Sequence, residues 1–274
     1  MGSERELLER IASALERLSP PPPAPTDWTA HPAYIWDGKS ASGIDALDAL
    51  PLEALRGIDE QKDRVHQNLS RFAQRAAAHD MLLWGARGMG KSALIRAVVS
   101  DIQGKAPEAL ALVHLAPGSV ESLPQLMQSL SQIRRGFILF LDDLGFENGQ
   151  AQHNLALRSL LDGGVAPRPA NVRVAVTANR RAIVTRDGIA SDALHERDER
   201  DNALALADRF GITLGFHPCD RDTYLGIVRG YTEPLGLEID EEEALAWAIA
   251  RGNRSGRTAY QFSVEMAGRA GKVV

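Results

Sequence analysis

Residues 81–92, with the sequence MLLWGARGMGKS, constrain the fold of this chain more than any other stretch. They read as an apolar strand, a glycine-rich loop and the start of a helix that continues through apolar residues to position 99. Residues 85–92 match the pattern Gly-x-x-x-x-Gly-Lys-Ser, whose glycines let the backbone wrap closely around phosphate groups. Successive backbone N–H groups and the helix N-terminus supply positive charge there. The sequence therefore predicts a site for a polyphosphate.

The polar residues of this loop have defined roles in binding a nucleoside triphosphate. Lys91 can reach the β and γ phosphates as a point charge, and Ser92 can offer its hydroxyl to Mg²⁺. The residues expected to surround the nucleotide here are Gly85, Ala86, Arg87, Gly88, Met89, Gly90, Lys91, Ser92 and Ala93.

Two other interpretations fit the loop less well. A flexible turn with a surface lysine does not explain the apolar strand before the loop or the helix after it. A dinucleotide-binding fold is a second alternative, because residues 88–93 also fit the pattern Gly-x-Gly-x-x-Ala. That fold needs an acidic residue at the end of the second strand, and the candidate strand, residues 110–115, ends without one.

Composition excludes several classes of protein. The 274 residues leave room for one large domain, or for a core and a smaller unit. The single cysteine, Cys219, rules out an intrachain disulfide and suits a reducing cytosol. Every apolar run is shorter than the ~20 residues of a membrane span, and no signal-peptide pattern opens the chain. We therefore expect a cytoplasmic protein with no membrane partner, and the net charge of −5 is weak evidence against one wrapped in nucleic acid.

The first part of the chain, residues 1–25, reads as an amphipathic helix followed by a stiff linker that contains five prolines. The apolar side of the helix carries Leu7, Leu8, Ile11, Leu15 and Leu18. Docking on the core of its own chain is the simplest expectation, and a neighbouring subunit or another protein are alternatives. Residues 26–56 read as an irregular extension of the next domain, anchored by Trp28, Tyr34 and Trp36.

Residues 26–217 are predicted to form an α/β domain with a five-stranded parallel sheet covered by helices on both faces. The expected strands are residues 81–84, 110–115, 137–141, 171–177 and 212–216. The expected helices of this domain include residues 56–78, 122–133 and 152–161. Residues 218–274 change character, because residues 220–231, 240–251 and 258–268 read as three helices with no strand between them. We expect a small, all-helical domain there.

Polar residues follow two of the expected strands where they end. Asp142 and Asp143 end the apolar run of residues 137–141, and Asn179 ends the strand around residues 171–177. Carboxyl ends of parallel strands meet at the edge where ligands bind. Asp142 would therefore hold the Mg²⁺ hydration shell beside Ser92, and Asp143 would polarise the attacking water. The less specific interpretation is a solvated turn after each strand.

Two arginines complete the set of candidates. Arg209 precedes the fifth expected strand, and Arg257 opens the last expected helix. Each is either a solvated surface charge or a cation aimed at a phosphate.

In this order the motifs resemble the AAA+ superfamily of ATPases, and within it a bacterial family of predicted ATP-binding proteins described mainly as uncharacterised. The resemblance covers roughly residues 50–270, and the matching stretches are residues 83–88, 137–144, 179–181, 208–211 and 255–259. It implies ATP and Mg²⁺ as ligands, with adenine held near Gly57 and Ile58. It also implies that Asn179 is a sensor, that Arg209 is an arginine finger given to the adjacent subunit, and that Arg257 is a second sensor on a helical lid.

The chain departs from the superfamily at Asp143, where glutamate is usual. The side chain of Asp143 is one methylene shorter than that of glutamate, so we expect slow hydrolysis, with the distant Glu147 as a substitute for the missing carboxylate. The alternative is that Asp143 still acts, through an attacking water in a slightly shifted position. Residues 183–207 form a charged segment in which the signs alternate, which favours a solvated helix or loop. The isolated His114 and His195 do not indicate a metal site.

The sequence thus predicts an ATPase that forms homo-oligomers, such as hexameric rings, and that remodels or loads a protein partner. A DNA-associated ATPase of the initiator or loader kind is the alternative. It needs a basic face, for which the sequence offers a loose group: Arg168, Arg173, Arg180, Arg181 and Arg186. A slow regulatory switch with little turnover is a further alternative.

Overall fold

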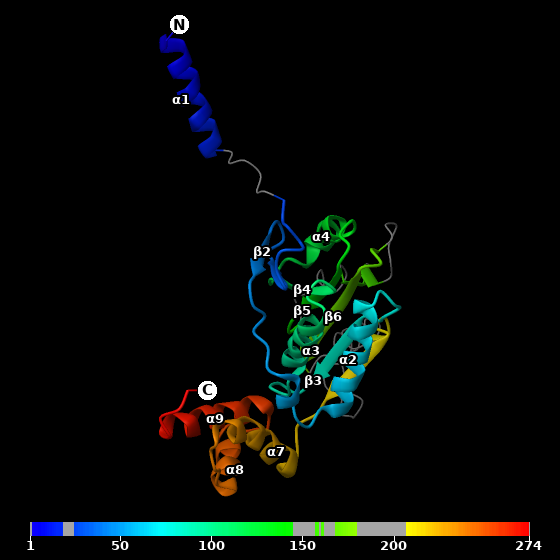
Figure 1. The fold of residues 1–274 in the computed structure, drawn as a ribbon, viewed down its shortest axis with the longest axis vertical. Coiled ribbons are helices and arrows are strands. Elements are labelled where there is room, and N and C mark those ends of the chain that lie inside the picture. Colours follow the sequence, from blue (N-terminus) through cyan, green and yellow to red (C-terminus); the bar gives the residue numbers. More distant parts are fainter. Residues whose placement is uncertain are drawn as a thin grey trace, which may run out of the picture.

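The computed structural model describes residues 2–18, 25–144, 157–158, 160–161, 168–179 and 207–273. Its centre is a seven-stranded sheet with the strand order β2-β1-β4-β5-β6-β3-β7 (Figure 1). The strands are β1 (Ala33–Trp36), β2 (Ala41–Ile44), β3 (Met81–Gly85), β4 (Leu110–Leu115), β5 (Gly136–Leu141), β6 (Val172–Asn179) and β7 (Ile212–Phe216). Neighbouring strands are parallel, except that β1 and β2 are antiparallel.

The prediction of five strands is wrong, because β1 and β2 come from the segment expected to be irregular. Each has four residues, too few to give a long apolar run, and β2 is only half-buried. β1 is placed by its parallel pairing with β4, from Ala33 opposite Leu112 to Trp36 opposite Leu115. The expected anchors of this segment are confirmed, because Trp28, Tyr34 and Trp36 are all buried. The five expected strands are present at the expected positions.

Helices cover both faces of the sheet, as alternation of strands and helices predicts. α2 (Asp59–Ala73) and α3 (Lys91–Lys105) pack on one face, and α4 (Leu123–Leu130) packs on the other. α2 ends five residues before the expected position 78, and Arg75 follows it in the left-handed region with φ of 61°. The helix expected over residues 152–161 lies mostly outside the described residues.

Three further helices form a separate unit with its own apolar core. These are α7 (Arg221–Thr232), α8 (Glu241–Ala250) and α9 (Gly256–Arg269), which meet around Tyr224, Val228, Ala248 and Phe262. Asp220, Asp240 and Ser255 cap their N-termini, each accepting hydrogen bonds from backbone N–H groups of the first turn. Short 3-10 helices complete the described structure: η1 (Leu52–Ala54), η2 (Val120–Ser122) and η4 (Glu233–Leu235).

Helix α1 (Gly2–Leu18) stands apart from the rest of the chain (Figure 1). The expectation that it docks on its own core is wrong, because Leu7, Leu8, Ile11 and Leu15 are all exposed. The proline-rich stretch expected to act as a stiff linker lies outside the described residues, except for Pro25. Within the described residues, no helix has the length and apolar content needed to cross a membrane.

Candidate functional site

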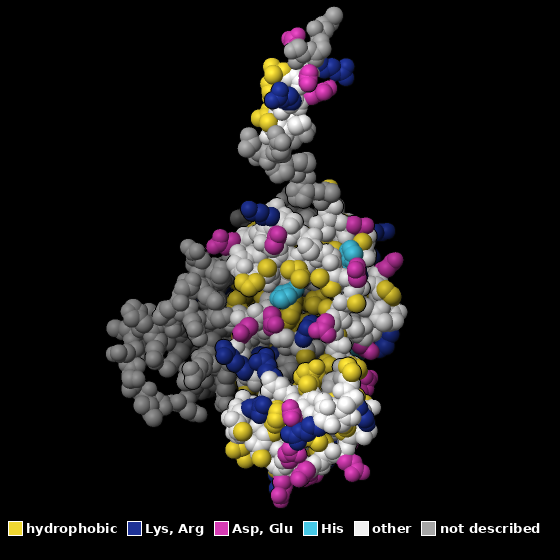
Figure 2. Space-filling model, turned by 90° about the vertical axis from the view of Figure 1, so that its left-hand side faces the viewer, with side chains coloured by type: hydrophobic (Ala, Val, Ile, Leu, Met, Phe, Trp, Pro, Cys, Tyr) yellow, Lys and Arg dark blue, Asp and Glu magenta, His cyan; other side chains and the backbone are white. Residues whose placement is uncertain are grey.

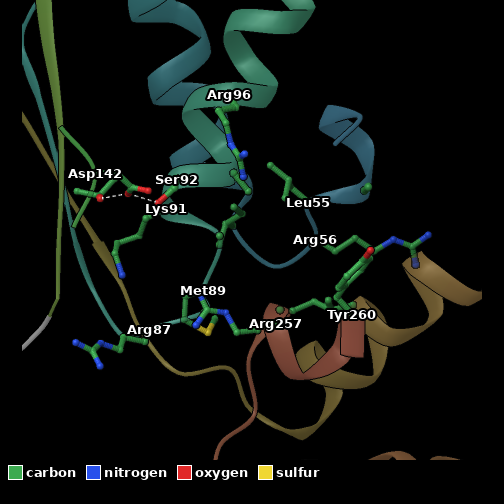
Figure 3. Close-up of a pocket in the computed structure, with 18 of the residues that line it drawn as sticks. Leu55, Arg56, Arg87, Met89, Lys91, Ser92, Arg96, Asp142, Arg257 and Tyr260 are labelled. Atoms are coloured by element: carbon green, nitrogen blue, oxygen red, sulfur yellow. Dashed lines mark hydrogen bonds between the residues drawn. The ribbon is translucent and has the colours of Figure 1, made fainter. Parts of the chain in front are cut away.

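The carboxyl ends of β3, β5 and β6 border a cavity of about 550 Å³ between the sheet and the helical unit (Figure 3). Figure 3 shows Ser92 and Asp142 facing each other at one end of the cavity, with Arg56 and Tyr260 at the other. The lining residues are Ala54, Leu55, Arg56, Ile58, Arg87, Gly88, Met89, Gly90, Lys91, Ser92, Ala93, Arg96, Asp142, Asp143, Thr177, Asn179, Ile227, Tyr231, Gly256, Arg257 and Tyr260.

The glycine-rich loop leaves β3 through a contact that only glycine allows. Gly85 has φ of 131°, and a Cβ there would lie 2.1 Å from the carbonyl oxygen of Phe216 in β7. The next residue, Ala86, donates its N–H to that same oxygen at 2.8 Å. The loop is therefore bound tightly to the sheet at its start, and it ends at Gly90, which caps α3 in the left-handed region. This geometry leaves the intervening backbone free to curve around phosphates.

Lys91 is buried at the base of the loop. Its Nζ atom donates to the carbonyl oxygens of Gly85 at 3.0 Å and Ala86 at 2.9 Å, and to Oδ1 of Asn179 at 3.4 Å. Burial lowers the pKa of Lys91 below its usual 10.5, and the nearby Asp143 and Asp142 act in the opposite direction. The structure thus brings the predicted lysine, carboxylates and asparagine into one site.

Asp142 lies at the centre of a set of oxygen ligands. Its Oδ1 atom accepts hydrogen bonds from Oγ of Ser92 at 2.5 Å and from Oγ1 of Thr177 at 2.6 Å. Mg²⁺ prefers such hard oxygen ligands and usually keeps several waters, so one carboxylate and one hydroxyl are enough when phosphate oxygens contribute the rest. Ser92 and Asp142 therefore fit the metal that the sequence predicts. The described residues contain no cluster of three or more metal-binding side chains.

Thr177 was not identified from the sequence, although it bonds to both aspartates, to the carboxylate of Asp142 and to the backbone of Asp143. Besides its bond to Asp142, its Oγ1 accepts the N–H of Asp143 at 2.8 Å, and its carbonyl oxygen accepts the N–H of Leu144 at 2.8 Å. The sequence feature that could have identified Thr177 is a hydroxyl side chain within the otherwise apolar run of β6. Asp143 itself has φ of 53°, which is unusual for a non-glycine residue. Its carboxylate accepts a hydrogen bond from the side-chain amide of Asn179.

Helix α9 reaches the loop from the helical unit. The backbone N–H of Arg257 donates to the carbonyl oxygen of Gly88 at 3.1 Å, and the side chain of Arg257 lines the cavity. A Cβ on Gly88 would lie 2.9 Å from Oγ of Ser255 and 3.0 Å from Cβ of Arg257, so α9 packs directly on the loop.

Positive charge dominates this cavity. Two carboxylates, Asp142 and Asp143, line it. Five cationic side chains line it: Arg56, Arg87, Lys91, Arg96 and Arg257. Arg87 and Arg257 are close enough to contribute to lowering the pKa of Lys91, after the larger effect of burial. Such an excess of positive charge suits a polyphosphate anion.

The other end of the cavity is apolar and was only partly predicted. Ile58 lines it, whereas Gly57 does not and instead makes a close turn, with φ of 76°, against Thr223 of α7. Four further apolar or aromatic residues complete this end: Leu55, Ile227, Tyr231 and Tyr260. The rings of Tyr231 and Tyr260 pack edge to face at 5.5 Å. No sequence signal reveals this set, because Ile227, Tyr231 and Tyr260 come from the helical unit, far along the chain from Leu55.

Arg209 is not brought into this cavity. It is exposed in the turn before β7 and is absent from the residues that line the cavity. Because β7 runs parallel to β3, with Ile212 opposite Met81, this turn lies at the end of the sheet away from the loop.

Two members of the loose basic group are described, and both are engaged in contacts within the domain. Arg168 pairs with Asp80, and Arg173 donates to the carbonyl oxygens of Ala78 and Val172. Arg180, Arg181 and Arg186 lie outside the described residues, as do Glu147, His195 and nearly all of residues 183–207.

Comparison with protein families gives one match over nearly the whole chain. A family model described as "Protein of unknown function (DUF815)" matches residues 29–270. The matched region includes the loop, both carboxylates, Asn179, Arg209 and Arg257, and it leaves α1 outside.

Individual proteins extend this similarity to the AAA+ ATPases. The chain is 25% identical over 185 residues to the chromosomal replication initiator protein DnaA of Dechloromonas aromatica (strain RCB), covering 65% of this chain but only 36% of that protein. A RuvB variant of Thermotoga maritima superimposes with a TM-score of 0.53 at 18% identity, covering 82% of this chain and 68% of that one. Aeropyrum pernix ORC1, solved in complex with DNA, gives 0.54 at 17% identity, with 80% and 65% covered. These structural similarities establish the fold.

Proposed function

The chain belongs to the protein family described as DUF815, and we propose that it is an AAA+ ATPase that binds Mg-ATP and hydrolyses it. One observation carries the proposal: a cationic cavity of about 550 Å³ contains the buried Lys91, the Ser92–Asp142 pair and the Asp143–Asn179 pair. The apolar end, with Ile58 and Tyr260, is suited to a purine base.

Binding in this proposal uses the loop and α3. Backbone N–H groups of residues 86–92 surround the phosphates, and Lys91 exchanges its carbonyl contacts for the β and γ phosphates. Ser92 and Asp142 hold Mg²⁺, which supplies charge neutralisation at the phosphate oxygens when bound. GTP is less favoured, because the chain contains no Asn-Lys-x-Asp sequence to read guanine.

Hydrolysis in this proposal is an in-line attack of water on the γ phosphorus. Asp143 orients and polarises the water, and Asn179, which holds the Asp143 carboxylate, positions that group. The shorter side chain of Asp143 leads us to propose slow turnover. If turnover is negligible, the ATP-bound state itself becomes the output, and the protein is a regulatory switch.

Two arginines connect the site to larger motions. We place Arg209 in the role of a finger for the adjacent subunit of a homo-oligomer such as a hexameric ring, since its turn is remote from its own cavity. Arg257 would contact the γ phosphate from a helical lid formed by residues 218–274. Hydrolysis would then change the position of the lid and act on a protein partner.

A DNA-associated initiator or loader is the second candidate, favoured by the similarity to DnaA. The engagement of Arg168 and Arg173 in contacts within the domain argues against it. This candidate would be favoured if labelled duplex DNA binds with an affinity that falls with salt concentration as steeply as contacts with several phosphates require.

The binding proposal is tested by substituting Lys91. Calorimetry with a non-hydrolysable ATP analogue should give an affinity about 10–100-fold lower for Lys91→Ala, because a charge-assisted contact to phosphate is lost. Lys105→Ala, at the exposed end of the same helix, is the matched control and should bind like the wild type. Equal affinities for both variants would show that the nucleotide does not bind at this loop.

A further inference from the structure

Helix α1 presents a broad apolar face to solvent, visible as hydrophobic side chains along one side of the helix in Figure 2. Its large apolar side chains are mostly exposed: Leu7 by 56%, Leu8 by 62%, Ile11 by 47% and Leu15 by 59%. A helix of 17 residues is marginally stable alone in water and gains most of its stability by packing this face. Another surface is therefore expected to cover it.

The width of this face exceeds what one partner helix covers. With Leu8 at position a of a heptad, the apolar residues from 7 to 18 all fall at positions g, a, d and e. They are Leu7 at g, Leu8 at a, Ile11 at d, Ala12 at e, Ala14 at g, Leu15 at a and Leu18 at d. At 100° per residue these positions span about 160° of the helix surface. A two-helix seam uses positions a and d, so α1 can contact two neighbouring helices at once.

The charges beside this face differ between its two edges. Position b borders the e edge and holds Glu9, whereas position c borders the g edge and holds Arg10. The sequence repeats the same pair one heptad later, as Glu16 and Arg17. From residue 7 onward, one edge of the helix is therefore acidic and the other basic, and Arg5, at position e one turn earlier, pairs with Glu9 at 3.4 Å. Parallel copies arranged in a closed ring bring each acidic edge against the basic edge of the next copy, whereas antiparallel neighbours bring like charges together.

We propose that α1 docks on the α1 helices of other copies of this chain and forms a parallel, closed bundle. A membrane surface fits less well, because helices that bind it carry Lys and Arg across the polar face. The polar face of α1 mixes both signs: Glu6 at position f, Glu9 at b and Arg10 at c. Tethering by residues 19–25 to subunits that already associate raises the effective concentration of the helices. This proposal deepens the homo-oligomer of the proposed function, but the bundle itself needs no nucleotide.

The test is sedimentation of the full chain without nucleotide. The wild type should form assemblies of three or more copies, and Leu8→Glu combined with Leu15→Glu should sediment as single chains. Ser13→Glu, which adds a charge at position f on the outer side, is the control and should remain assembled. A wild type that stays a single chain at every concentration, or a double variant that assembles like the wild type, would overturn the proposal.

A charge exchange tests the parallel arrangement directly. Glu9→Arg alone should lower the association constant about threefold per helix pair, because two basic edges then meet. Adding Arg10→Glu should restore the association constant, since the two edges are again complementary. An association constant that stays low in the double variant would contradict the parallel, closed bundle. A flotation assay with phosphatidylserine vesicles tests the membrane alternative. If the wild type floats with the vesicles and the Leu8 and Leu15 double variant does not, a membrane covers the apolar face and the proposal is overturned. Phosphate release from ATP in the same samples reports separately on the proposed ATPase.

Discussion

At the scale of single residues, the hydroxyl of Thr177 organises the acidic side of the cavity. It donates to Asp142, the proposed magnesium ligand, and accepts the backbone N–H of Asp143, the proposed catalytic residue. The threonine is almost fully buried, so water cannot replace these contacts without rearrangement of the strand. In the proposed mechanism, its position would couple metal binding at Asp142 to the orientation of Asp143.

We predict that Thr177→Val raises the Mg²⁺ concentration needed for half-maximal ATP hydrolysis by about 10–100-fold, as loss of a residue that orients a metal ligand commonly does. Valine keeps the shape of the side chain but removes the hydroxyl. The measurement is a magnesium titration of phosphate release. Thr213→Val on the exposed side of β7 is the control and should leave the titration unchanged. An unchanged titration for Thr177→Val would remove this residue from the site.

The local motif was predictable from the sequence at this scale, whereas contacts between segments were not. The spacing of residues 85–92 is a local property of a strand, loop and helix, so it can be read directly. Asp142, Asp143 and Asn179 were found because carboxyl ends of parallel strands share an edge. Thr177, Tyr231 and Tyr260 were missed, because their roles depend on three-dimensional contacts that no spacing encodes.

At the scale of elements, Arg135 fastens the N-terminal extension to the sheet. This buried guanidinium donates to carbonyl oxygens of Trp28 at 3.2 Å, His31 at 2.7 Å and Pro107 at 3.0 Å, among others. Burial lowers the pKa of Arg135 below its usual value. It precedes β5 directly, so it connects the segment before β1 with the centre of the sheet.

We predict that Arg135→Leu lowers the free energy of unfolding by about 3 kcal/mol, because several buried carbonyl groups lose a charged donor. Urea denaturation measures the change. The neighbouring Arg134 is exposed, and Arg134→Leu should change the stability by no more than about 0.5 kcal/mol. If the two variants lose equal stability, Arg135 does not hold the extension in place.

The expected and observed helices and strands differ in ways that show which elements the sequence could reveal. Long apolar runs identified β3 to β7, and the absence of strand-like runs after residue 218 identified the last three helices, although α9 begins at Gly256 and not at the expected position 258. β1 was missed because it pairs with β4, a strand distant in the sequence, where Ala33 lies opposite Leu112, and β2 was missed because it pairs with β1. The exposed position of α1 was also missed, since an amphipathic pattern shows that a face needs cover but not what covers it.

At the scale of the whole molecule, the proposal that Arg209 acts on an adjacent subunit rests on its distance from the cavity of its own chain. Its turn lies at the opposite end of β7 from the loop. We predict that Arg209→Ala binds ATP with normal affinity but hydrolyses it poorly, as does Asp143→Asn. Mixing the two variants should recover activity at about a quarter of the interfaces in a randomly assembled ring. No recovery, or full activity of Arg209→Ala, would contradict action between subunits.

Release of phosphate from ATP, measured for the wild type and Asp143→Asn, tests the central claim most directly. The account predicts Mg²⁺-dependent release by the wild type, and a rate at least about 100-fold lower for Asp143→Asn with unchanged nucleotide affinity. Asp63→Asn, on the exposed side of α2, is the matched control and should match the wild type. Equal rates for Asp143→Asn and the wild type, or no release from bound ATP by the wild type, would contradict the account.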